Sequence, residues 1–322
     1  MSLAVAAMVT GCSLLGGSSS SSSSSTASSA GLEKTHLTVG MLSAIDVVPA
    51  YIAQDKGYFA QQGLNVTLQT VSGGSQSIPA LVGGSLDIAF SNWGSMFSAQ
   101  EKKLGDFRAI VDAYQSQEQN VLVTLPGSGI KSVKDLVGKT ISANNLTGTA
   151  TIAFKELLKS NNVDPNSVKI TTLGYSDVPA ALANHQVVAS ILLEPYLSEV
   201  ERSNGAVPVS DLFGPGPTLN MPIAGYMTLA KTVQQDPKTI AAFQRAMIKA
   251  QEEANNNPTE VQQEMVKHLK MDQQTADIVH IGSWFTSVSA ARLQRVADLL
   301  TSFGVLTDKL DVTPLVTPIP SN

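Results

Sequence analysis

The sequence of 322 residues has little cysteine, little charge and no long apolar run, and each shortage excludes a class of protein. Its single cysteine, Cys12, excludes an intramolecular disulfide and a metal site built from several cysteines. Charged residues make up 15% and the net charge is −5, so we do not expect nucleic-acid binding, which needs a basic patch. No uninterrupted apolar stretch approaches the ~18 residues of a transmembrane helix. The four histidines are scattered with no two at metal-ligand spacing, and we expect no metal site: His36, His185, His268 and His280.

The sequence contains a faint internal repeat. The apolar run at 66–71 and the following Ile78-Pro79-Ala80 return as the run at 168–173 and Val178-Pro179-Ala180. Each copy reads as a strand, a turn bearing Gly or Ser, a short helix that opens near a proline, and a second strand. The repeat indicates two similar lobes that share a cleft, although two ordinary βαβ units could resemble each other by chance.

The N-terminus has the features of a targeting signal. The apolar run LAVAAMV at 3–9 leads to small residues directly before Cys12, as in a bacterial lipoprotein signal. We therefore expect residues 1–11 to be a signal remnant and residues 12–32 to be a lipidated Cys12 with a disordered Ser-rich tether. The first basic residue is Lys34, whereas a signal peptide needs a positively charged start. The alternatives are a truncated leader and a disordered N-terminus with an incidental cysteine.

Strand patterns alternate with helix patterns, and a helical tail follows. The expected strands are 36–42, 64–71, 86–90, 108–113, 120–125 and 140–143, and the expected tail helices are 239–255, 258–269, 273–281 and 290–303. This order predicts an α/β fold with mostly parallel sheets. In such sheets, ligands bind beyond the carboxyl ends of the strands.

Polar turns follow the expected strands and supply most of the candidate site. Exposed N–H groups at the start of a helix can bind an anion, and the turn 147–151 is the best candidate because it follows a strand and offers several hydroxyls. Simple helix capping is an equally good explanation for any single turn. The candidate ligand-binding residues are Ser43, Asp46, Ser75, Gln76, Asn92, Trp93, Asn145, Thr147, Thr149, Thr151, Asp177 and Glu194.

Acidic and aromatic residues near the expected site suggest what the ligand carries. No arginine lies in a candidate turn, which argues against an oxyanion held by paired guanidinium groups. Asp46, Asp177 and Glu194 could bind an ammonium or the amino groups of a pyrimidine. For Glu194 the alternative is a structural salt bridge or a hinge hydrogen bond, and for Asp46 a solvated loop. Trp93 in a polar turn favours a pocket wall or a stacking platform over a core position, whereas Trp284 fits the core.

Several short motifs together resemble a known family. They are Tyr51-Ile52-Ala53, Lys56-Gly57-Tyr58-Phe59, Ala80-Leu81, Asp87-Ile88-Ala89, the run 132–136 with Gly138-Lys139, and Glu194-Pro195. Over about residues 35 to 305 the chain is similar to the substrate-binding proteins of ABC importers in the nitrate/sulfonate/taurine group. That group includes binding proteins for thiamine-precursor pyrimidines.

The resemblance implies a two-lobed fold of the periplasmic-binding-protein type II, with sheets flanked by helices and a helical C-terminal tail. Lobe 1 would be 33–118 plus 225–322, and lobe 2 would be 119–224. It implies the ABC importer permease and ATPase subunits as partners. We expect a monomer without cofactor or metal, lipid-anchored through Cys12 outside the cytoplasm. The sulfonate-binding turn of the family would fall on 147–151.

Three functions follow, in order of preference. The first is capture of a small sulfonate or zwitterion such as taurine, with its anionic end at Thr149 and Thr151 and any amine at Asp46 or Glu194. The second is binding of a heteroaromatic solute stacked on Trp93. The third is an enzyme on the same fold. Pyrimidine-synthesising enzymes of this fold carry a Cys-rich motif that Cys12 alone cannot supply, and no nucleophile–base pair is evident, so we expect a binding protein and not an enzyme.

Overall fold

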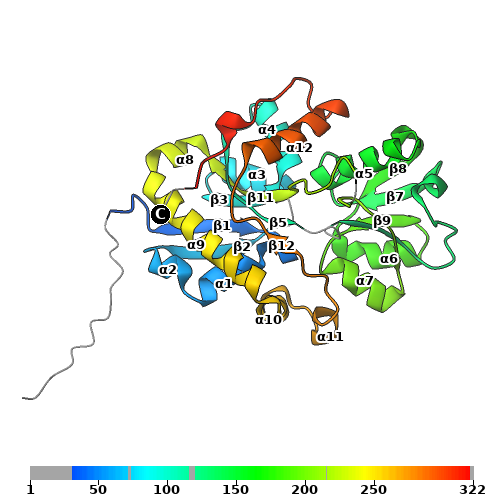
Figure 1. Cartoon of the computed structure of the whole chain (residues 1–322), viewed down its shortest axis with the longest axis horizontal. Coiled ribbons are helices and arrows are strands. Elements are labelled where there is room, and N and C mark those ends of the chain that lie inside the picture. Colours follow the sequence, from blue (N-terminus) through cyan, green and yellow to red (C-terminus); the bar gives the residue numbers. More distant parts are fainter. Residues whose placement is uncertain (1–30, 72–73, 116–119, 215, 320–322) are drawn as a thin grey trace, which may run out of the picture.

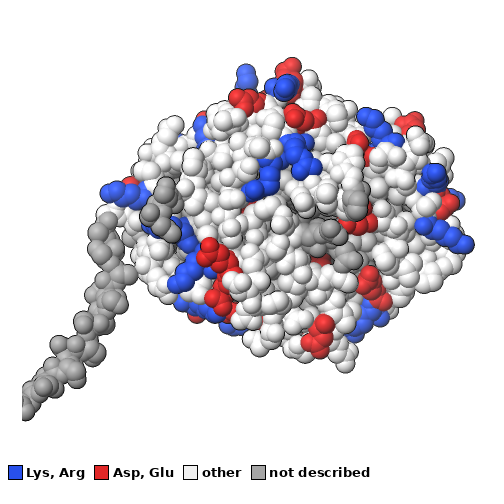
Figure 2. All heavy atoms as spheres, viewed as in Figure 1, with Lys and Arg blue, Asp and Glu red and all other residues white. Residues whose placement is uncertain are grey.

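A computed structural model describes residues 31–71, 74–115, 120–214 and 216–319. Two bodies of sheet and helix lie side by side, as Figure 1 shows, with the helical tail packed mainly on the first. The predictions for Cys12 and the Ser-rich tether fall outside the described residues. On the face shown in Figure 2, acidic and basic side chains are interspersed and most of the surface is uncharged. No helix in the described part of the chain is both long and apolar enough to span a membrane.

Two five-stranded sheets form the framework. In spatial order, the first sheet contains β2 (Asn65–Thr70), β1 (His36–Met41), β3 (Ile88–Asn92), β11 (Ala224–Leu229) and β4 (Phe107–Asp112). The second contains β10 (Val207–Asp211), β6 (Val121–Thr124), β9 (Ala189–Leu192), β7 (Thr140–Ala143) and β8 (Lys169–Thr172). A small ladder joins β5 (Tyr114–Gln115) to β12 (Ser283–Trp284).

Helices cover both sheets. Around the first sheet lie α1 (Val48–Asp55), α2 (Tyr58–Gln61), α3 (Gly74–Val82), α4 (Trp93–Glu101), α8 (Ala230–Gln235), α9 (Pro237–Asn256), α10 (Pro258–Leu269), α11 (Gln273–Ala276) and α12 (Ala290–Ser302). Around the second lie α5 (Thr149–Ser160), α6 (Val178–Ala183) and α7 (Tyr196–Asn204). Short 3-10 turns are η1 (Ile45–Val47), η2 (Val133–Leu136), η3 (Pro165–Ser167), η4 (Tyr175–Asp177) and η5 (Thr313–Leu315).

The internal repeat is real and extends through both sheets. β1 pairs in parallel with β2 and β3, and β7 pairs in parallel with β8 and β9. In each sheet the next strand, β11 or β6, runs antiparallel to these three strands, and the edge strand beyond it, β4 or β10, reverses again and runs in their direction. The α/β fold with mixed, mostly parallel sheets is confirmed, because four of the five strands in each sheet run in the same direction. The strands that follow a crossing between the two bodies enter their sheets from the opposite end, so half of the ladders in each sheet are antiparallel.

The long helix α9 holds the edge of the first sheet. Its apolar positions recur every three or four residues, which places one face against the core. From this face, Gln244 donates its amide N–H to the carbonyl of Ile110 at 2.8 Å, and Gln251 donates to the carbonyl of Asp112 at 2.7 Å. The backbone N–H of Thr317 donates to the next outward carbonyl, that of Ala109, at 2.9 Å. Side-chain amides and the C-terminal segment thus occupy the outer edge of β4.

The tail departs from its expected form after α10. The sequence predicts a helix over 273–281, but α11 ends at Ala276. The chain then extends so that Ser283 and Trp284 pair with β5. The indole Nε1 of Trp284 donates to the carbonyl of Asp46 at 3.0 Å, and Trp284 is buried as expected. The C-terminal tail therefore packs against η1 and holds its backbone by this hydrogen bond.

Gly225 in β11 lies where the ring of Trp93 and the backbone of β4 leave no room for a side chain. A Cβ placed on Gly225 would lie 2.2 Å from Cζ2 of Trp93 and 2.4 Å from the carbonyl oxygen of Val111. One of these neighbours is backbone and the other is a fully buried ring, so neither can move aside.

We expect Gly225→Ala to lower the free energy of unfolding by about 1–3 kcal/mol, the usual cost of overpacking a well-filled core. Urea unfolding followed by tryptophan fluorescence measures the change. Gly83→Ala is the matched control, because its added Cβ would lie no closer than 3.1 Å to another atom and should cost less. Equal stability of the Gly225→Ala protein and the wild type would contradict this packing.

Candidate functional site

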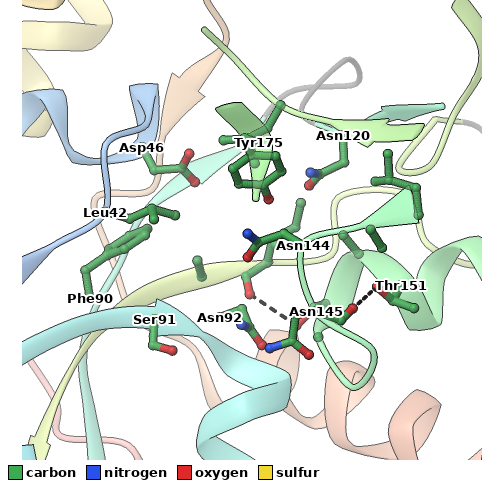
Figure 3. A pocket seen from close by; sticks show the side chains of 18 residues that line it. Leu42, Asp46, Phe90, Ser91, Asn92, Asn120, Asn144, Asn145, Thr151 and Tyr175 are labelled. Carbon is green, nitrogen blue, oxygen red and sulfur yellow. Dashed lines mark hydrogen bonds between the residues drawn. The ribbon is translucent and has the colours of Figure 1, made fainter. Parts of the chain in front are cut away.

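A cavity lies between the two sheets, where both sets of parallel strands end. Its volume is about 710 Å³ including its open mouth. The first body contributes Leu42, Asp46 and the end of β3, and the second contributes the end of β7, Tyr175 and the first turn of α5. Figure 3 shows Asp46, Tyr175, Asn120 and Asn144 around the same space. The polar turns after the strands thus meet at one place, as the sheet topology predicts.

Asp46 is the one charged side chain among the residues that line the cavity. It belongs to η1 and is only 5% exposed, so it is not the solvated loop residue of the alternative interpretation. Tyr175 lies on the opposite wall. Burial raises the pKa of the Tyr175 hydroxyl far above its ordinary value, and the negative charge of Asp46 raises it further. Tyr175 therefore stays a neutral phenol that can donate a hydrogen bond.

Four asparagine side chains supply neutral dipoles to the wall. Asn92 caps α4 by accepting the N–H of Ser95 at 2.8 Å, and Asn145 accepts the N–H of Thr147 at 2.7 Å. These two amides are held by the fold. Within the described residues, the amides of Asn120 and Asn144 have no hydrogen-bond partner, and both line the cavity. They can turn either an oxygen or an N–H toward a ligand.

The start of α5 is arranged differently from the sequence expectation. The hydroxyl of Thr149 accepts the N–H of Gly94 at 3.1 Å and donates to the carbonyl of Ile223 at 3.2 Å. The hydroxyl of Thr151 donates to the carbonyl of Asn145. Both hydroxyls therefore hold the fold together. The N-cap residue is Gly148, with no side-chain cap, so the N–H groups of the first turn can donate hydrogen bonds to a ligand that lies in the cavity.

Five of the predicted residues line this cavity: Asp46, Asn92, Asn145, Thr149 and Thr151. Ser43 instead lines a separate space below α7, beside Tyr196. Gln76, Thr147 and Asp177 are exposed and lie outside the lining, and the side chain of Ser75 is outside the described residues. Sequence reasoning missed Leu42, Phe90, Asn120, Asn144 and Tyr175. Tyr175 stands two residues before Asp177 in η4, and the turn directs the tyrosine inward.

Glu194 has a structural role. Its carboxylate accepts the N–H of Ser198 at 3.1 Å and its hydroxyl at 2.8 Å, at the start of α7. It also accepts the N–H of His280 at 3.1 Å, across to the helical tail. Burial raises the pKa of this carboxyl, and these hydrogen bonds oppose the shift. Glu194 does not line the cavity, which agrees with the alternative of a structural hydrogen bond.

Trp93 lies in the core and not in the cavity wall. Its ring is fully buried against Gly225, and its indole Nε1 makes no hydrogen bond within the described residues. Beside it lies the buried carboxyl of Asp112, which pairs with Arg292 at 3.0 Å. Burial raises the pKa of Asp112 to about 6, against the opposing effect of the Arg292 guanidinium. The aromatic side chains that do line the cavity are Phe90 and Tyr175.

Comparison with protein families gives a direct match. A family model described as NMT1/THI5 like matches residues 44–261. Among curated proteins, "Putative binding protein YtlA" of Bacillus subtilis is 23% identical over 218 residues. That alignment covers 66% of this chain and 64% of YtlA, so the chain spans slightly less than two thirds of that relative.

Solved structures share the fold. The alkanesulfonate-binding protein SsuA of Xanthomonas axonopodis, bound to MOPS, has a TM-score of 0.77 at 18% identity and covers 89% of this chain and 99% of its own. The periplasmic nitrate-binding protein NrtA of Synechocystis has a TM-score of 0.73 at 16% identity, over 88% and 85% of the two chains. These likenesses confirm the periplasmic-binding-protein fold.

The buried Asp112 predicts a pH dependence of stability. Its folded pKa of about 6 lies above the ~3.9 of an unfolded aspartate, so the folded protein binds this proton more tightly than the unfolded chain. The resulting contribution to the free energy of unfolding is fully present below about pH 4 and is lost as pH rises through 6. Two pKa units correspond to about 3 kcal/mol. We expect the free energy of unfolding of Asp112→Asn to stay level between pH 4 and pH 7, whereas that of the wild type falls. Denaturant unfolding at pH 4, 5, 6 and 7 measures both. A variant whose stability falls with pH as steeply as the wild type would contradict the assignment.

Proposed function

Because the chain belongs to the NMT1/THI5-like family, we propose that it is the solute-binding protein of an ABC importer and captures a small zwitterionic organic solute by closure of two lobes. The observation that carries this proposal is the polarity of the cavity. One wall holds the buried carboxylate of Asp46, and the other holds the uncapped start of α5. An amine and an anionic group on one short molecule would match both.

The cavity chemistry favours a taurine-like zwitterion over a simple anion. A cavity for nitrate or a plain sulfonate would gain from a guanidinium or ammonium group, and the lining contains neither. An anion would also meet the negative charge of Asp46 in a poorly hydrated space, where repulsion is strong. The N–H groups of α5 and the amides of Asn120 and Asn144 offer neutral hydrogen bonds to the anionic end.

A heteroaromatic solute such as a thiamine-precursor pyrimidine is the second candidate. Phe90 and Tyr175 line the cavity and can contact a planar ring, in place of the Trp93 platform. Asparagine amides can read the ring nitrogens and amino groups, and Asp46 can accept from an exocyclic amine. Both candidates therefore depend on the same carboxylate.

The two sheets correspond to two proposed lobes, and the N-terminal segment would place the protein in the cell. We propose lobe 1 as 33–118 with 225–322 and lobe 2 as 119–224, each lobe carrying one of the two sheets. Cys12 would carry the lipid anchor outside the cytoplasm, and the Ser-rich segment would link it to the first lobe. The monomer would deliver its solute to the permease and ATPase subunits of the importer, without catalysing a reaction.

We expect Asp46→Asn to weaken binding of an amine-bearing solute by at least ~30-fold, or about 2 kcal/mol, because a desolvated charge pair is lost. Isothermal calorimetry with taurine, an alkanesulfonate, nitrate and an aminopyrimidine measures the affinities. Asp177→Asn is the matched control, since Asp177 is an exposed carboxylate in η4 outside the cavity lining, and it should bind as the wild type does.

The panel separates the two solutes and can refute both. Heat with taurine alone supports the zwitterion, and heat with the aminopyrimidine alone supports the heteroaromatic solute. Binding of nitrate or the alkanesulfonate with unchanged affinity in Asp46→Asn would contradict the role of Asp46. No heat with any of the four would reject both solute classes.

A further inference from the structure

A second polar cluster lies on the outer side of the first body, between α1 and α10. It consists of Asp55 at the end of α1 with Glu264 and His268 one turn apart on α10. Nε2 of His268 lies 2.7 Å from Oδ2 of Asp55 and 3.1 Å from Oε2 of Glu264. One donor atom from each residue falls within 4.8 Å of the others. None of the three residues lines the solute cavity.

The carboxylate of Glu264 is in an unfavourable position without a ligand. Glu264 is 9% exposed, and its Oε2 is buried without a hydrogen bond of acceptable geometry in the described part of the chain. Burial raises the pKa of this carboxyl, and the neighbouring carboxylate of Asp55 raises it further. A buried acceptor left unsatisfied is costly, and a cation placed beside it would remove that cost.

We propose that Asp55, Glu264 and His268 form a binding site for a divalent transition metal such as Zn²⁺. One imidazole nitrogen and two carboxylate oxygens are ordinary zinc donors, and three protein ligands leave a position for water. Donor atoms around a tetrahedral zinc lie about 3.4 Å apart, so the cluster needs only small side-chain shifts to enclose the ion. Ca²⁺ and Mg²⁺ prefer all-oxygen sites and should bind weakly.

Neighbouring residues orient His268 and Glu264, and the ammonium of Lys267 would compete with a metal for Asp55. The ring of His268 stacks on Tyr51, with centroids 4.3 Å apart and planes within 5°, which orients the imidazole. His268 and Glu264 are four residues apart on α10 and so share a face of the helix. The ammonium of Lys267 lies 2.5 Å from Oδ2 of Asp55, on a side chain that is 57% exposed. The metal would displace this ammonium, which can swing into solvent.

The site was not evident from histidine spacing, because only one of its ligands is a histidine and the third ligand comes from a helix more than 200 residues earlier. If occupied, the metal would tie α1 to α10. α1 follows directly after η1, which carries Asp46, and α10 leads to α11. The test below uses no solute, so its outcome is independent of the proposed transport function.

The experiment is a zinc titration of the whole chain after removal of metals by chelator, with a chromophoric chelator as competitor. We expect one Zn²⁺ per chain. His268→Gln and Glu264→Gln should weaken binding by more than about 100-fold, beyond the usual effect of losing a group that only supports a ligand. His36→Gln, which changes an exposed histidine at the start of β1, is the matched control and should leave the affinity unchanged.

Lys267→Ala separates a metal site from a purely structural ion-pair cluster. If the ammonium competes with the metal for Asp55, its removal should tighten zinc binding several-fold. X-ray absorption of the zinc-loaded protein should show one imidazole and oxygen neighbours. The proposal is overturned if the wild type binds no zinc at micromolar concentration, or if folded His268→Gln protein, checked by circular dichroism, binds zinc as the wild type does.

Discussion

The cavity depends on one buried hydroxyl, that of Thr149. It accepts the N–H of Gly94 and donates to the carbonyl of Ile223, which also accepts the N–H of Trp93. Three chain segments meet there: the start of α4, the start of α5 and the residue before β11. Thr149 is 1% exposed, so loss of its hydroxyl would leave the buried N–H of Gly94 unsatisfied and remove one of the two hydrogen bonds that the carbonyl of Ile223 accepts. This contact fixes the distance between the two bodies at the floor of the cavity.

The same contact explains why two helix starts can face each other at such short range. A Cβ on Gly94 would lie 2.8 Å from the carbonyl oxygen of Thr147, so only glycine fits at the second position of α4. Two positive helix ends placed together would repel. Asn92 satisfies one of them by capping α4, whereas α5 has no side-chain cap and begins in the cavity lining. One helix start is thus capped by a side chain, and the other lies at the cavity without such a cap.

Sequence patterns predicted the framework well, because strand and helix periodicity reflects burial that is local to each element. The repeat was visible as sequence and is present as two sheets with equivalent ladders. The positions of Asp46, Asn92 and Asn145 could also be predicted, since all three follow strands at the same edge. The short α11 was not, because pairing of Ser283 and Trp284 with β5 is a tertiary contact that no local pattern records.

The predicted site residues that proved wrong differ from the structure mainly in the direction of their side chains. Trp93 stands in a polar turn, yet the helix that begins there turns its ring toward Gly225, which lies 132 residues further along the chain. The threonines of α5 bear the right groups for binding an anion, but their partners are carbonyl and N–H groups of the protein itself. Tyr175 was not predicted, because the local sequence does not show that η4 turns this tyrosine, and not Asp177, toward the cavity. Each of these outcomes is decided by a distant neighbour rather than by the local sequence.

The amide contacts of α9 also bear on how the protein behaves at high concentration. An edge strand with open carbonyls is a template onto which a strand of another molecule can add. In β4 the outward carbonyls of Ala109, Ile110 and Asp112 are already occupied by Thr317, Gln244 and Gln251. Two of these donors are glutamine side chains on the well-packed helix α9. The edge is therefore covered by a helix, and no further strand with an open edge of its own is needed. This edge of the first sheet is therefore closed to strand addition by another molecule.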